Sequence, residues 1–336
     1  MIKTGIVGAL SYTGRELLKI FEKHSQAELV YCTSESSGGK TGTFFPFLRN
    51  NIHLQKYQTQ NAAASCDLIF LALPPGAAHD YVYELTTLKP ELKIIDLSGA
   101  YRLISPEDFS FYYGFEHRHI SLAEKAVYGL CEIYREKIRK AQLITNPGCY
   151  PTAALLPLVP LIRKNLVEPK DIIIDAKSGI SGKGKKLHED SLFCELNENS
   201  CSYKTGTHQH TPEIERILAD NGLGIKVLFS PSVIPLSRGM LSNSYFRSRA
   251  PLEKLIETLA SFYKNSPFIK IREAGRYPAI LDVAGTNQAH INIFEDERTG
   301  FFLAVSAIDN LLKGASGQAV QNMNIMYGIN ETEGLL

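Results

Sequence analysis

Apolar and polar residues alternate in a strand–helix pattern along the first 150 residues. Short apolar runs predict strands at residues 2–8, 28–32, 68–73, 93–97 and 142–145. Helical spacing of apolar residues predicts helices at residues 14–24 and 76–88, and Leu17, Leu18 and Phe21 share one face of the first. Strands that alternate with helices at this spacing predict βαβ units and a parallel, doubly wound sheet.

The pattern changes after residue 150, where strands follow strands. Runs with many β-branched residues predict strands at residues 171–177, 225–234, 241–249, 288–295 and 301–308. Helical spacing recurs at residues 151–164, 212–221 and 252–264. This order predicts an α+β domain with a mixed or antiparallel sheet and helices on one face. The final amphipathic stretch, residues 309–327, is long enough to return to the first domain.

The length of 336 residues exceeds what one hydrophobic core usually serves, so two domains are expected. We predict a dinucleotide-binding domain at residues 1–148, completed by a C-terminal helix at 309–328, and a catalytic and substrate domain at 149–308. The formal net charge is +1, so no global field recruits nucleic acid or an anionic membrane.

The six cysteines form neither a C-x-x-C motif nor a tight framework, so we expect free thiols in a reducing cytosol. The N-terminus lacks a basic region and a cleavage-site pattern, which argues against a signal peptide. The most apolar short run, residues 68–73, stops at Pro74-Pro75, far short of the ~20 residues that a membrane span needs. We therefore expect a cytoplasmic protein.

A glycine-rich turn follows the first predicted strand, in the segment G-I-V-G-A-L-S-Y-T-G at residues 5–14. A strand, a glycine turn and a helix N-terminus together form an anion site, because backbone N–H groups and the helix dipole point at a pyrophosphate. The spacing departs from G-x-G-x-x-G, and a merely tight connection is the alternative. Its position in the first βα unit favours dinucleotide binding.

The segment T-S-E-S-S-G-G-K at residues 33–40 follows the second strand, where a dinucleotide-binding fold reads the adenosine ribose. Its hydroxyls and its cation can hold the 2′-phosphate of NADP, through Ser34, Ser36, Ser37 and Lys40. Glu35 favours the opposite, because an acidic side chain there typically bonds the free 2′-hydroxyl of NAD. A solvated loop is the alternative.

Cys149 lies in N-P-G-C-Y-P-T, residues 146–152, where a strand ends and a helix begins. A thiol at that place is next to unpaired N–H groups and the helix dipole, and both favour the thiolate and lower its pKa. Pro151 suits the first turn of that helix, where its missing N–H costs nothing. An isolated cysteine is usually inert packing, but this position between two domains makes Cys149 the candidate nucleophile.

Two histidines alternate in G-T-H-Q-H-T-P-E, residues 206–213, before a helix that we expect to start with Thr211 as N-cap and Pro212 at its first position. One histidine can serve as general acid/base for the thiol and the developing oxyanion, with Glu213 close enough to orient it. A metal site is one alternative, but a zinc-bound thiolate would accept acyl groups poorly, so we expect no metal. Two structural histidines are the other alternative.

Three further segments are rich in polar and charged residues. K-S-G-I-S-G-K-G-K-K, residues 177–186, can form a nest of N–H groups under positive charge that suits a phosphate or carboxylate, or it is a solvated loop. Arg102 follows the 93–97 strand at the carboxyl edge, where open α/β sheets bind ligands, and is a candidate anion fork. His117-Arg-His119 has no nucleophile nearby in sequence and is interpreted as a surface or interface feature.

Taken together, these segments resemble the N-acetyl-γ-glutamyl-phosphate reductases, a family within the wider aspartate-semialdehyde dehydrogenase group. The likeness runs essentially end to end, and its motifs together are highly specific. They are G-x-x-G-A-x-x-Y-T-G at 5–14, F-L-A-L-P at 70–74, D-L-S-G-A-Y-R-L at 96–103, N-P-G-C-Y-P-T at 146–152, K-S-G-I-S-G at 177–182, H-Q-H-T-P-E-I at 208–214, P-L-S-R-G at 235–239 and N-L-L-K-G-A-S-G-Q-A-V-Q-N-M-N at 310–324.

The resemblance implies roles for individual residues. The nucleophile falls on Cys149, and the catalytic histidine falls on His210, because H-T-P-E resembles the H-S-x motif of the related dehydrogenases; His208 is the alternative. Substrate contacts are implied at Arg102, Ser178, Gly179, His208, Glu213 and Arg238. Cofactor contacts are implied at Gly8, Ser11, Tyr12, Thr13, Gly14, Ser34, Ser36, Ser37 and Gly317.

Two residues depart from the family pattern. Ser11 stands where the family more often has glycine, which is expected to narrow the pyrophosphate turn. Glu35 stands where a basic residue is common. The resemblance therefore implies NADPH as the cofactor, and NAD stays an alternative because of Glu35.

The resemblance also implies a fold and a reaction. The fold is α/β, with a Rossmann-type dinucleotide-binding domain and an α+β substrate/dimerisation domain, in a homodimer or homotetramer. The reaction is the NADPH-dependent reduction of the small molecule N-acetyl-γ-glutamyl phosphate to N-acetylglutamate semialdehyde and phosphate, through a Cys149 thioester, in arginine biosynthesis. Three alternatives stay open: a carrier-protein-linked glutamyl or aminoadipyl phosphate reductase, an aspartate-semialdehyde dehydrogenase, and a catalytically silent nicotinamide-binding regulator.

Overall fold

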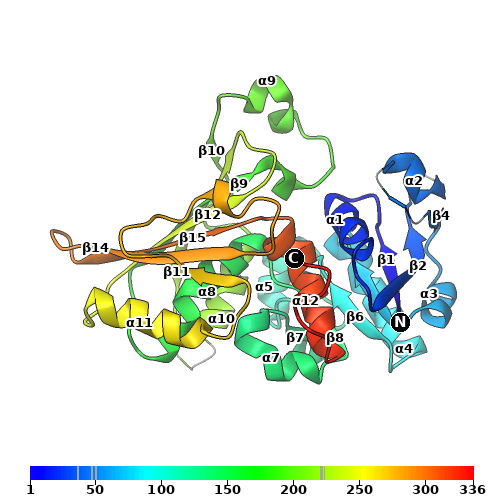
Figure 1. Cartoon of the computed structure of the whole chain (residues 1–336), viewed down its shortest axis with the longest axis horizontal. Coiled ribbons are helices and arrows are strands. Elements are labelled where there is room, and N and C mark those ends of the chain that lie inside the picture. The colour runs from blue at the N-terminus through cyan, green and yellow to red at the C-terminus, as the bar shows by residue number, and fades with distance from the viewer. Residues whose placement is uncertain (36–37, 47, 50, 220–221, 223) are drawn as a thin grey trace. The chain divides into compact units, whose positions relative to one another are not determined.

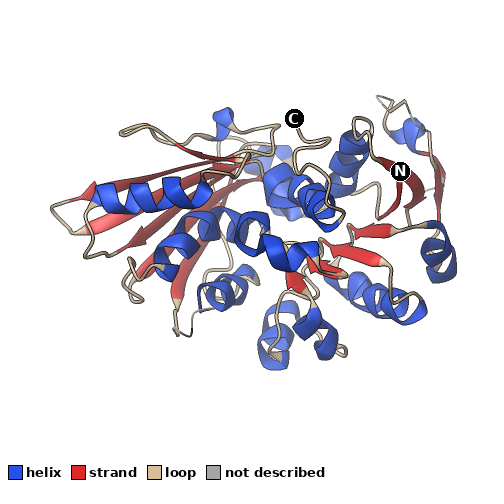
Figure 2. Cartoon of the chain, turned by 60° about the horizontal axis from the view of Figure 1, so that its bottom comes forward, coloured by secondary structure: helices blue, strands red, loops and turns tan. Residues whose placement is uncertain are grey.

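The computed structural model describes residues 1–35, 38–46, 48, 49, 51–219, 222 and 224–336. The chain forms two compact units: unit 1 contains Met1–Pro147 and Ala315–Leu336, and unit 2 contains Gly148–Gly314. The chain therefore leaves unit 1 after Pro147 and returns to it at Ala315. Each unit is built on a sheet of its own (Figures 1 and 2).

Unit 1 contains an eight-stranded sheet in the order β3-β4-β2-β1-β5-β6-β8-β7. Every pair from β4 to β7 along this order is parallel, which confirms the predicted doubly wound sheet, whereas the short β3 runs antiparallel to β4 at the edge. The strands are β1 (Ile2–Val7), β2 (Ala27–Thr33), β3 (Gly39–Lys40), β4 (His53–Gln55), β5 (Leu68–Leu71), β6 (Lys93–Asp96), β7 (Val127–Tyr128) and β8 (Leu143–Thr145).

The helices of unit 1 cover its sheet. On the first of them Leu17, Leu18 and Phe21 are buried, as their shared face predicts. The helices are α1 (Tyr12–Phe21), α2 (Thr41–Phe44), α3 (Thr59–Ser65), α4 (Pro75–Leu88), α5 (Pro106–Tyr113), α6 (Ile120–Lys125), α7 (Cys131–Arg139) and α12 (Gly317–Met326).

The C-terminal helix α12 differs from the amphipathic helix that we expected, because all of its residues are buried. Its polar face is paired inside unit 1 rather than hydrated. Gln321 donates to the carboxylates of Glu132 and Glu331, and Asn322 donates to the Gly129 carbonyl. Buried amides are tolerated only where such partners exist, so α12 is an integral part of unit 1.

Unit 2 contains a seven-stranded sheet in the order β10-β11-β9-β12-β15-β14-β13. Strands β9 and β11 are parallel, whereas β9, β12, β15 and β14 pair antiparallel in turn, so the sheet is mixed, as predicted. The strands are β9 (Ile172–Gly179), β10 (Cys201–Ser202), β11 (Val227–Ile234), β12 (Met240–Phe246), β13 (Ile269–Ile271), β14 (Ala289–Asp296) and β15 (Phe301–Ile308).

Three long helices of unit 2, α8 (Cys149–Arg163), α10 (His210–Leu218) and α11 (Leu252–Tyr263), lie along the same side of this sheet (Figure 1). The short α9 (Phe193–Leu196) lies in the long connection between β9 and β10. A π-helical turn, Leu312–Ser316, spans the return to unit 1. Among the residues that the model describes, no helix combines the length and apolar character that a membrane crossing requires.

The start of α10 corrects one prediction. The helix begins at His210, and its N-cap is Gln209 rather than Thr211. The reason is that His208 supplies the cap: its ring Nδ1 accepts the His210 N–H at 3.1 Å, and its carbonyl accepts the Thr211 N–H. The helix therefore starts two residues earlier than a threonine cap would allow.

Candidate active site

The candidate nucleophile begins a long helix. Cys149 is the first residue of α8, after Gly148 as the N-cap, so its side chain lies at the positive end of the helix dipole. It is partly exposed, whereas Cys32 and Cys66 are buried. Burial raises the pKa of the Cys32 and Cys66 thiols, that of Cys66 to about 12. Position and access therefore favour Cys149 over these two thiols as a thiolate nucleophile.

Two glycines allow other groups to approach Cys149 closely. A Cβ on Gly314 would lie 2.8 Å from the Cys149 Cβ, so the turn at residue 314 packs directly on the nucleophile. A Cβ on Gly148 would lie 2.3 Å from Nε2 of His210. The imidazole of His210 therefore lies against the residue that precedes the nucleophile, where a general acid/base is needed.

His208 and His210 have different surroundings. The ring Nδ1 of His208 accepts the His210 N–H, and its ring packs edge-on against Tyr150, Tyr203 and Phe229. Burial lowers the pKa of His208 to about 2, so that it stays neutral at physiological pH. A neutral, buried ring that accepts a helix N–H suits a positioning role, which leaves His210 as the better candidate for proton transfer.

Glu213 is fully buried and lies one helical turn after His210 on α10. Its Oε1 accepts the Gly148 N–H at 2.9 Å. One helix thus carries the imidazole that lies against the nucleophile's turn and the carboxylate that holds this turn. The Glu213 carboxylate therefore supports the backbone next to the nucleophile, in addition to lying near His210 on the same helix.

We predict that Glu213→Ala lowers the free energy of unfolding by about 1–3 kcal/mol and also lowers kcat, because the Gly148 N–H is left buried without its acceptor. Glu213→Gln keeps an oxygen there and should lose less of both. Urea denaturation and steady-state kinetics measure the two effects, with the exposed first-turn residue Glu253→Ala as the control. Equal losses in the Gln and Ala variants would show that the acceptor oxygen is not what matters.

The structure brings three of the predicted substrate residues together in unit 2. The Gly179 N–H donates to the Gly239 carbonyl, and a Cβ on Gly179 would lie 2.8 Å from the backbone nitrogen of Arg238. Ser178 donates to the Gly179 carbonyl, and it lies within hydrogen-bonding reach of the Tyr150 hydroxyl, next to the nucleophile in sequence. The K-S-G-I-S-G and P-L-S-R-G segments therefore form one surface near the nucleophile's helix.

Two lysines of the 177–186 segment form ion pairs with acidic side chains. Lys183, at the end of a 3-10 turn, pairs with Asp190, and Lys177 pairs with Asp175. The loop therefore presents less unpaired positive charge than its sequence indicates.

Arg102 lies in unit 1 and is buried. Its Nε donates to the Asn146 carbonyl at 2.8 Å, and Nη2 donates to the Leu97 carbonyl at 3.0 Å. The guanidinium therefore ties the end of β6 to the segment that precedes the nucleophile. This contact was not foreseen, and a contact of Arg102 with substrate stays a prediction.

The predicted pyrophosphate turn lies where the strand order of unit 1 reverses, between β1 and β5. Gly8 has a φ of +92°, and a Cβ there would lie 2.4 Å from the Ala72 carbonyl oxygen. A Cβ on Gly14 would lie 2.4 Å from the Gly8 oxygen. Both glycines are thus required by the tight turn that opens α1. A glycine turn at a helix N-terminus and a switch point fits a dinucleotide.

Ser11 has a definite role in this turn. Its Oγ accepts the Gly14 N–H at 2.9 Å as the N-cap of α1 and also donates to the Gly8 carbonyl. The serine side chain therefore bridges the two ends of the turn, and its effect on the width of a pyrophosphate site stays a prediction. Thr13 is contacted by Ser316, the residue before Gly317, so the predicted cofactor residues Thr13 and Gly317 lie close together in unit 1.

The ribose segment is described only in part. Ser34 is buried and its N–H donates to the Gln55 carbonyl, whereas Glu35 and Lys40 are exposed. Ser36 and Ser37 lie outside the described residues.

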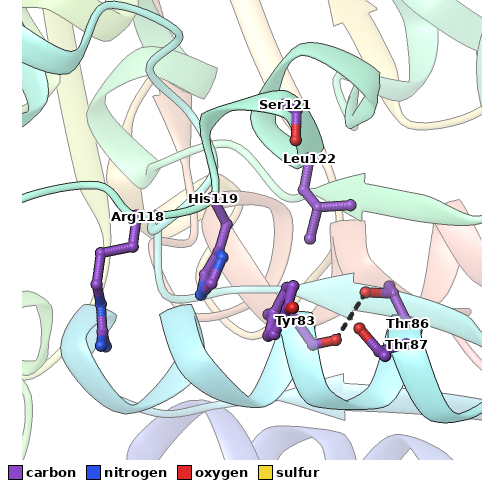
Figure 3. A pocket seen from close by; sticks show the side chains of 7 residues that line it. All are labelled: Tyr83, Thr86, Thr87, Arg118, His119, Ser121 and Leu122. Atoms are coloured by element: carbon purple, nitrogen blue, oxygen red, sulfur yellow. Dashed lines mark hydrogen bonds between the residues drawn. The ribbon is translucent and has the colours of Figure 1, made fainter.

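A pocket of about 540 Å³, which the sequence analysis did not predict, lies on unit 1 (Figure 3). It is lined by Tyr83, Thr86, Thr87, Arg118, His119, Ser121 and Leu122. The His117-Arg-His119 segment, expected at the surface, is only partly there. His117 is buried and bonds to the Ala100 carbonyl, and burial lowers its pKa to about 4.

Beside this pocket, ligand atoms of His79, Asp80 and His119 lie within 4.8 Å of one another. The hydrogen bonds argue against a metal ion there. His79 Nε2 accepts the Arg118 N–H, so in the neutral ring Nδ1 carries the proton and donates to Asp80. A protonated Nδ1 cannot bind a metal, and the group is better described as a structural network.

Comparison with known proteins agrees with this geometry over both units. The model of the semialdehyde dehydrogenase NAD-binding domain matches residues 3–141, and that of the semialdehyde dehydrogenase dimerisation domain matches residues 149–310. The chain therefore belongs to the semialdehyde dehydrogenase family.

Within that family, two similar curated proteins carry the same name. N-acetyl-gamma-glutamyl-phosphate reductase of Pelotomaculum thermopropionicum is 43% identical over 99% of this chain and 97% of that protein. The enzyme of the same name from Moorella thermoacetica is 43% identical over 100% of this chain and 98% of its own. Among solved structures, aspartate semialdehyde dehydrogenase II of Vibrio cholerae has the same fold, with a TM-score of 0.75 at 14% identity over 98% of both chains.

Proposed function

We propose that this protein reduces N-acetyl-γ-glutamyl phosphate to N-acetylglutamate semialdehyde and inorganic phosphate in arginine biosynthesis, with NADPH as the reductant. The observation that carries the proposal is the position of Cys149 at the start of α8, with His210 packed against Gly148. This arrangement suits covalent acyl transfer, and curated relatives about 42% identical over the full chain are named for this reaction.

The chain's own residues account for the covalent steps. The Cys149 thiolate attacks the γ-acyl carbon, the C–O bond to phosphate breaks, and a thioester remains on Sγ. When bound, the nicotinamide supplies a hydride to the thioester carbon. Protonated His210 gives its proton to the resulting oxyanion, which the α8 N-terminus also stabilises. His210 then takes this proton back as the C–S bond breaks, and the aldehyde and the thiolate are released.

For the cofactor, the residues that fit are those of the β1–α1 turn. Gly8 and Gly14 would allow the phosphates to approach closely, and Ser11, Tyr12 and Thr13 lie at the start of the helix whose N-terminus would face them. Ser34 and Lys40, on the segment after β2, would reach the ribose end. Arg238, Ser178 and Gly179 are proposed to hold an anionic group of the substrate.

We also propose a cytoplasmic homodimer or homotetramer. Half-buried positions alternate with buried ones along β12, and Leu241, Asn243 and Tyr245 form this second face. A mixed apolar and polar face of this kind is typical of a subunit interface, and the match to a dimerisation domain supports it. All six cysteines are free thiols, which suits a reducing compartment.

The proposed activity is tested in the reverse direction. The protein is incubated with N-acetylglutamate semialdehyde, phosphate and NADP⁺, and absorbance of the reduced cofactor is followed. We expect reduction that requires phosphate. No reduction with the free semialdehyde, but reduction with a carrier-linked or aspartate semialdehyde, would replace the proposed substrate and keep the chemistry.

We predict a preference for NADP over NAD that is only modest, because the exposed Glu35 carboxylate lies on the segment that reads the 2′-phosphate. Glu35→Arg should increase the preference by roughly 1–2 kcal/mol, the scale of one charge-assisted contact. The measurement is the ratio of kcat/KM for the two cofactors in both proteins. A wild type that prefers NAD outright would show that Glu35 bonds the ribose hydroxyls.

A further inference from the structure

Asp309, the residue directly after β15, is a fully buried carboxylate that accepts several hydrogen bonds. Its Oδ1 accepts the N–H groups of Leu311 and Leu312 at 2.9 and 3.2 Å, and its Oδ2 accepts the Gly285 N–H at 2.7 Å. Both oxygens also face the guanidinium of Arg238. A buried charge is stable only with such partners. Asp309 therefore fixes the positions of the groups that bond to it.

Asp309 first fixes the position of the Arg238 side chain. Nη2 of Arg238 donates to Oδ1 at 3.1 Å, and Nε lies 2.7 Å from Oδ2 as a second ion-pair contact, so the carboxylate meets the guanidinium at two points. The Arg238 side chain keeps 25% of its surface exposed, whereas that of Asp309 has none. Asp309 thus holds one side of the guanidinium, which stays partly exposed on unit 2, and the Arg238 backbone lies beside Gly179.

The ion pair with Asp309 leaves Arg238 able to bind a second anion. Three backbone N–H groups share the Asp309 carboxylate with Arg238 and spread its negative charge. A guanidinium has five N–H donors in a rigid plane, so a second anion can bind on the outer edge while Asp309 holds the inner one.

Asp309 also fixes the turn that packs on the nucleophile. The Gly314 N–H donates to the Asp309 carbonyl at 2.9 Å, a five-residue spacing that opens the π-helical turn. The Asp309 side chain caps the same turn through Leu311 and Leu312. Gly314 in turn lies against Cys149. One residue therefore contacts both the candidate anion-binding arginine and the support of the nucleophile.

The next residue strengthens this arrangement. Asn310 Oδ1 accepts the Gly239 N–H at 2.7 Å, and its Nδ2 donates to Ser181 at 3.0 Å. The side chains of residues 309 and 310 thus hold both neighbouring segments of the proposed substrate surface.

We propose that Asp309 is a positioning residue. It orients Arg238 toward an anionic group of the substrate, and it holds the turn at Gly314 that packs on Cys149. The inference rests on the proposed function, since that function supplies the anionic substrate. The group recognised is an oxyanion, either the carboxylate of the substrate or its phosphate.

The experiment compares two substitutions in the reverse assay, in which semialdehyde and phosphate have separate KM values. In Asp309→Asn the side-chain oxygen can still cap Leu311 and Leu312, but the amide nitrogen faces Arg238 and Gly285. We expect one of the two KM values to rise about 10- to 100-fold, as for a lost charge-assisted hydrogen bond, with kcat within about threefold of wild type. Asp309→Ala loses the cap as well and should also lower kcat.

The KM that rises distinguishes the two oxyanions. If Arg238 binds the phosphate group, the KM for phosphate rises. If Arg238 binds the substrate carboxylate, the KM for the semialdehyde rises. A double-mutant cycle with Arg238→Ala tests whether Asp309 acts through the arginine. We expect the double variant Asp309→Asn/Arg238→Ala to have the same KM as Arg238→Ala alone. Additive effects, or unchanged KM values in Asp309→Asn, would overturn the proposal.

If Asp309→Asn does not fold, Arg238→Lys takes its place, because lysine keeps the charge and loses the fork. An unchanged KM for both substrates in this variant would equally overturn the proposal. Wild-type protein that shows no activity with semialdehyde, phosphate and NADP⁺ together would instead refute the proposed function. The two failures are therefore distinct.

Discussion

Cys149→Ser is expected to abolish turnover while NADPH binding persists. A serine hydroxyl has a pKa far above that of a thiol, so it supplies almost no anionic nucleophile at neutral pH, even at the start of α8. The dinucleotide turn is formed by residues of unit 1, and Cys149 belongs to unit 2. Steady-state kinetics and cofactor binding followed by fluorescence test the two halves of this expectation.

The control for this variant is Cys194→Ser, which removes an exposed thiol and should leave turnover unchanged. Iodoacetamide should inactivate the wild type by labelling Cys149, and the acyl-phosphate substrate should protect it. Exposed thiols will also react, so the decisive readout is the residue whose labelling follows the loss of activity. If inactivation follows Cys194 or Cys201 while Cys149 stays unlabelled, the nucleophile is misassigned.

The second large effect is expected at His210. His210→Asn should lower kcat about 10²–10⁴-fold, the usual range for loss of a general acid/base, because the imidazole that lies against Gly148 is removed. Far-ultraviolet circular dichroism checks that the fold is retained.

His208→Asn is the matched comparison. The asparagine oxygen can accept the His210 N–H in place of Nδ1, so we expect weaker substrate binding and a kcat close to wild type. Because the pKa of His208 is lowered to about 2, this ring does not titrate near neutrality, and the pH profile should keep its shape. A dead His208 variant beside a nearly normal His210 variant would reverse the two roles.

Much of the fold was predictable because long buried strands carry long apolar runs. The strands that escaped prediction, β3, β4, β7, β10 and β13, have two or three residues each and lie at or near sheet edges, where so short a run leaves no periodic signal. The start of α10 was placed wrongly because the cap comes from a histidine ring, which propensities for N-cap residues do not include.

The residues of the candidate site could also be predicted only where the sequence signal is local. Cys149 and the two histidines stood out because strand-to-helix and H-x-H segments are local features. The contact of Glu213 with Gly148 joins residues 65 apart, and that of Asp309 with Arg238 joins residues 71 apart. Such contacts depend on the folded sheet and not on any segment, so Asp309 and Gly314 were not singled out.

The full burial of α12 in unit 1 has a consequence for biogenesis. On the ribosome, residues 148–314 emerge before Ala315–Leu336, so unit 2 can complete its sheet while unit 1 still lacks a helix that its interior needs. Until then the Gly129 carbonyl and the Glu132 carboxylate lack the donors that α12 supplies. The first domain to be synthesised is therefore the last to finish folding, and a chain shortened by its final helix would keep a folded unit 2 attached to an incomplete unit 1.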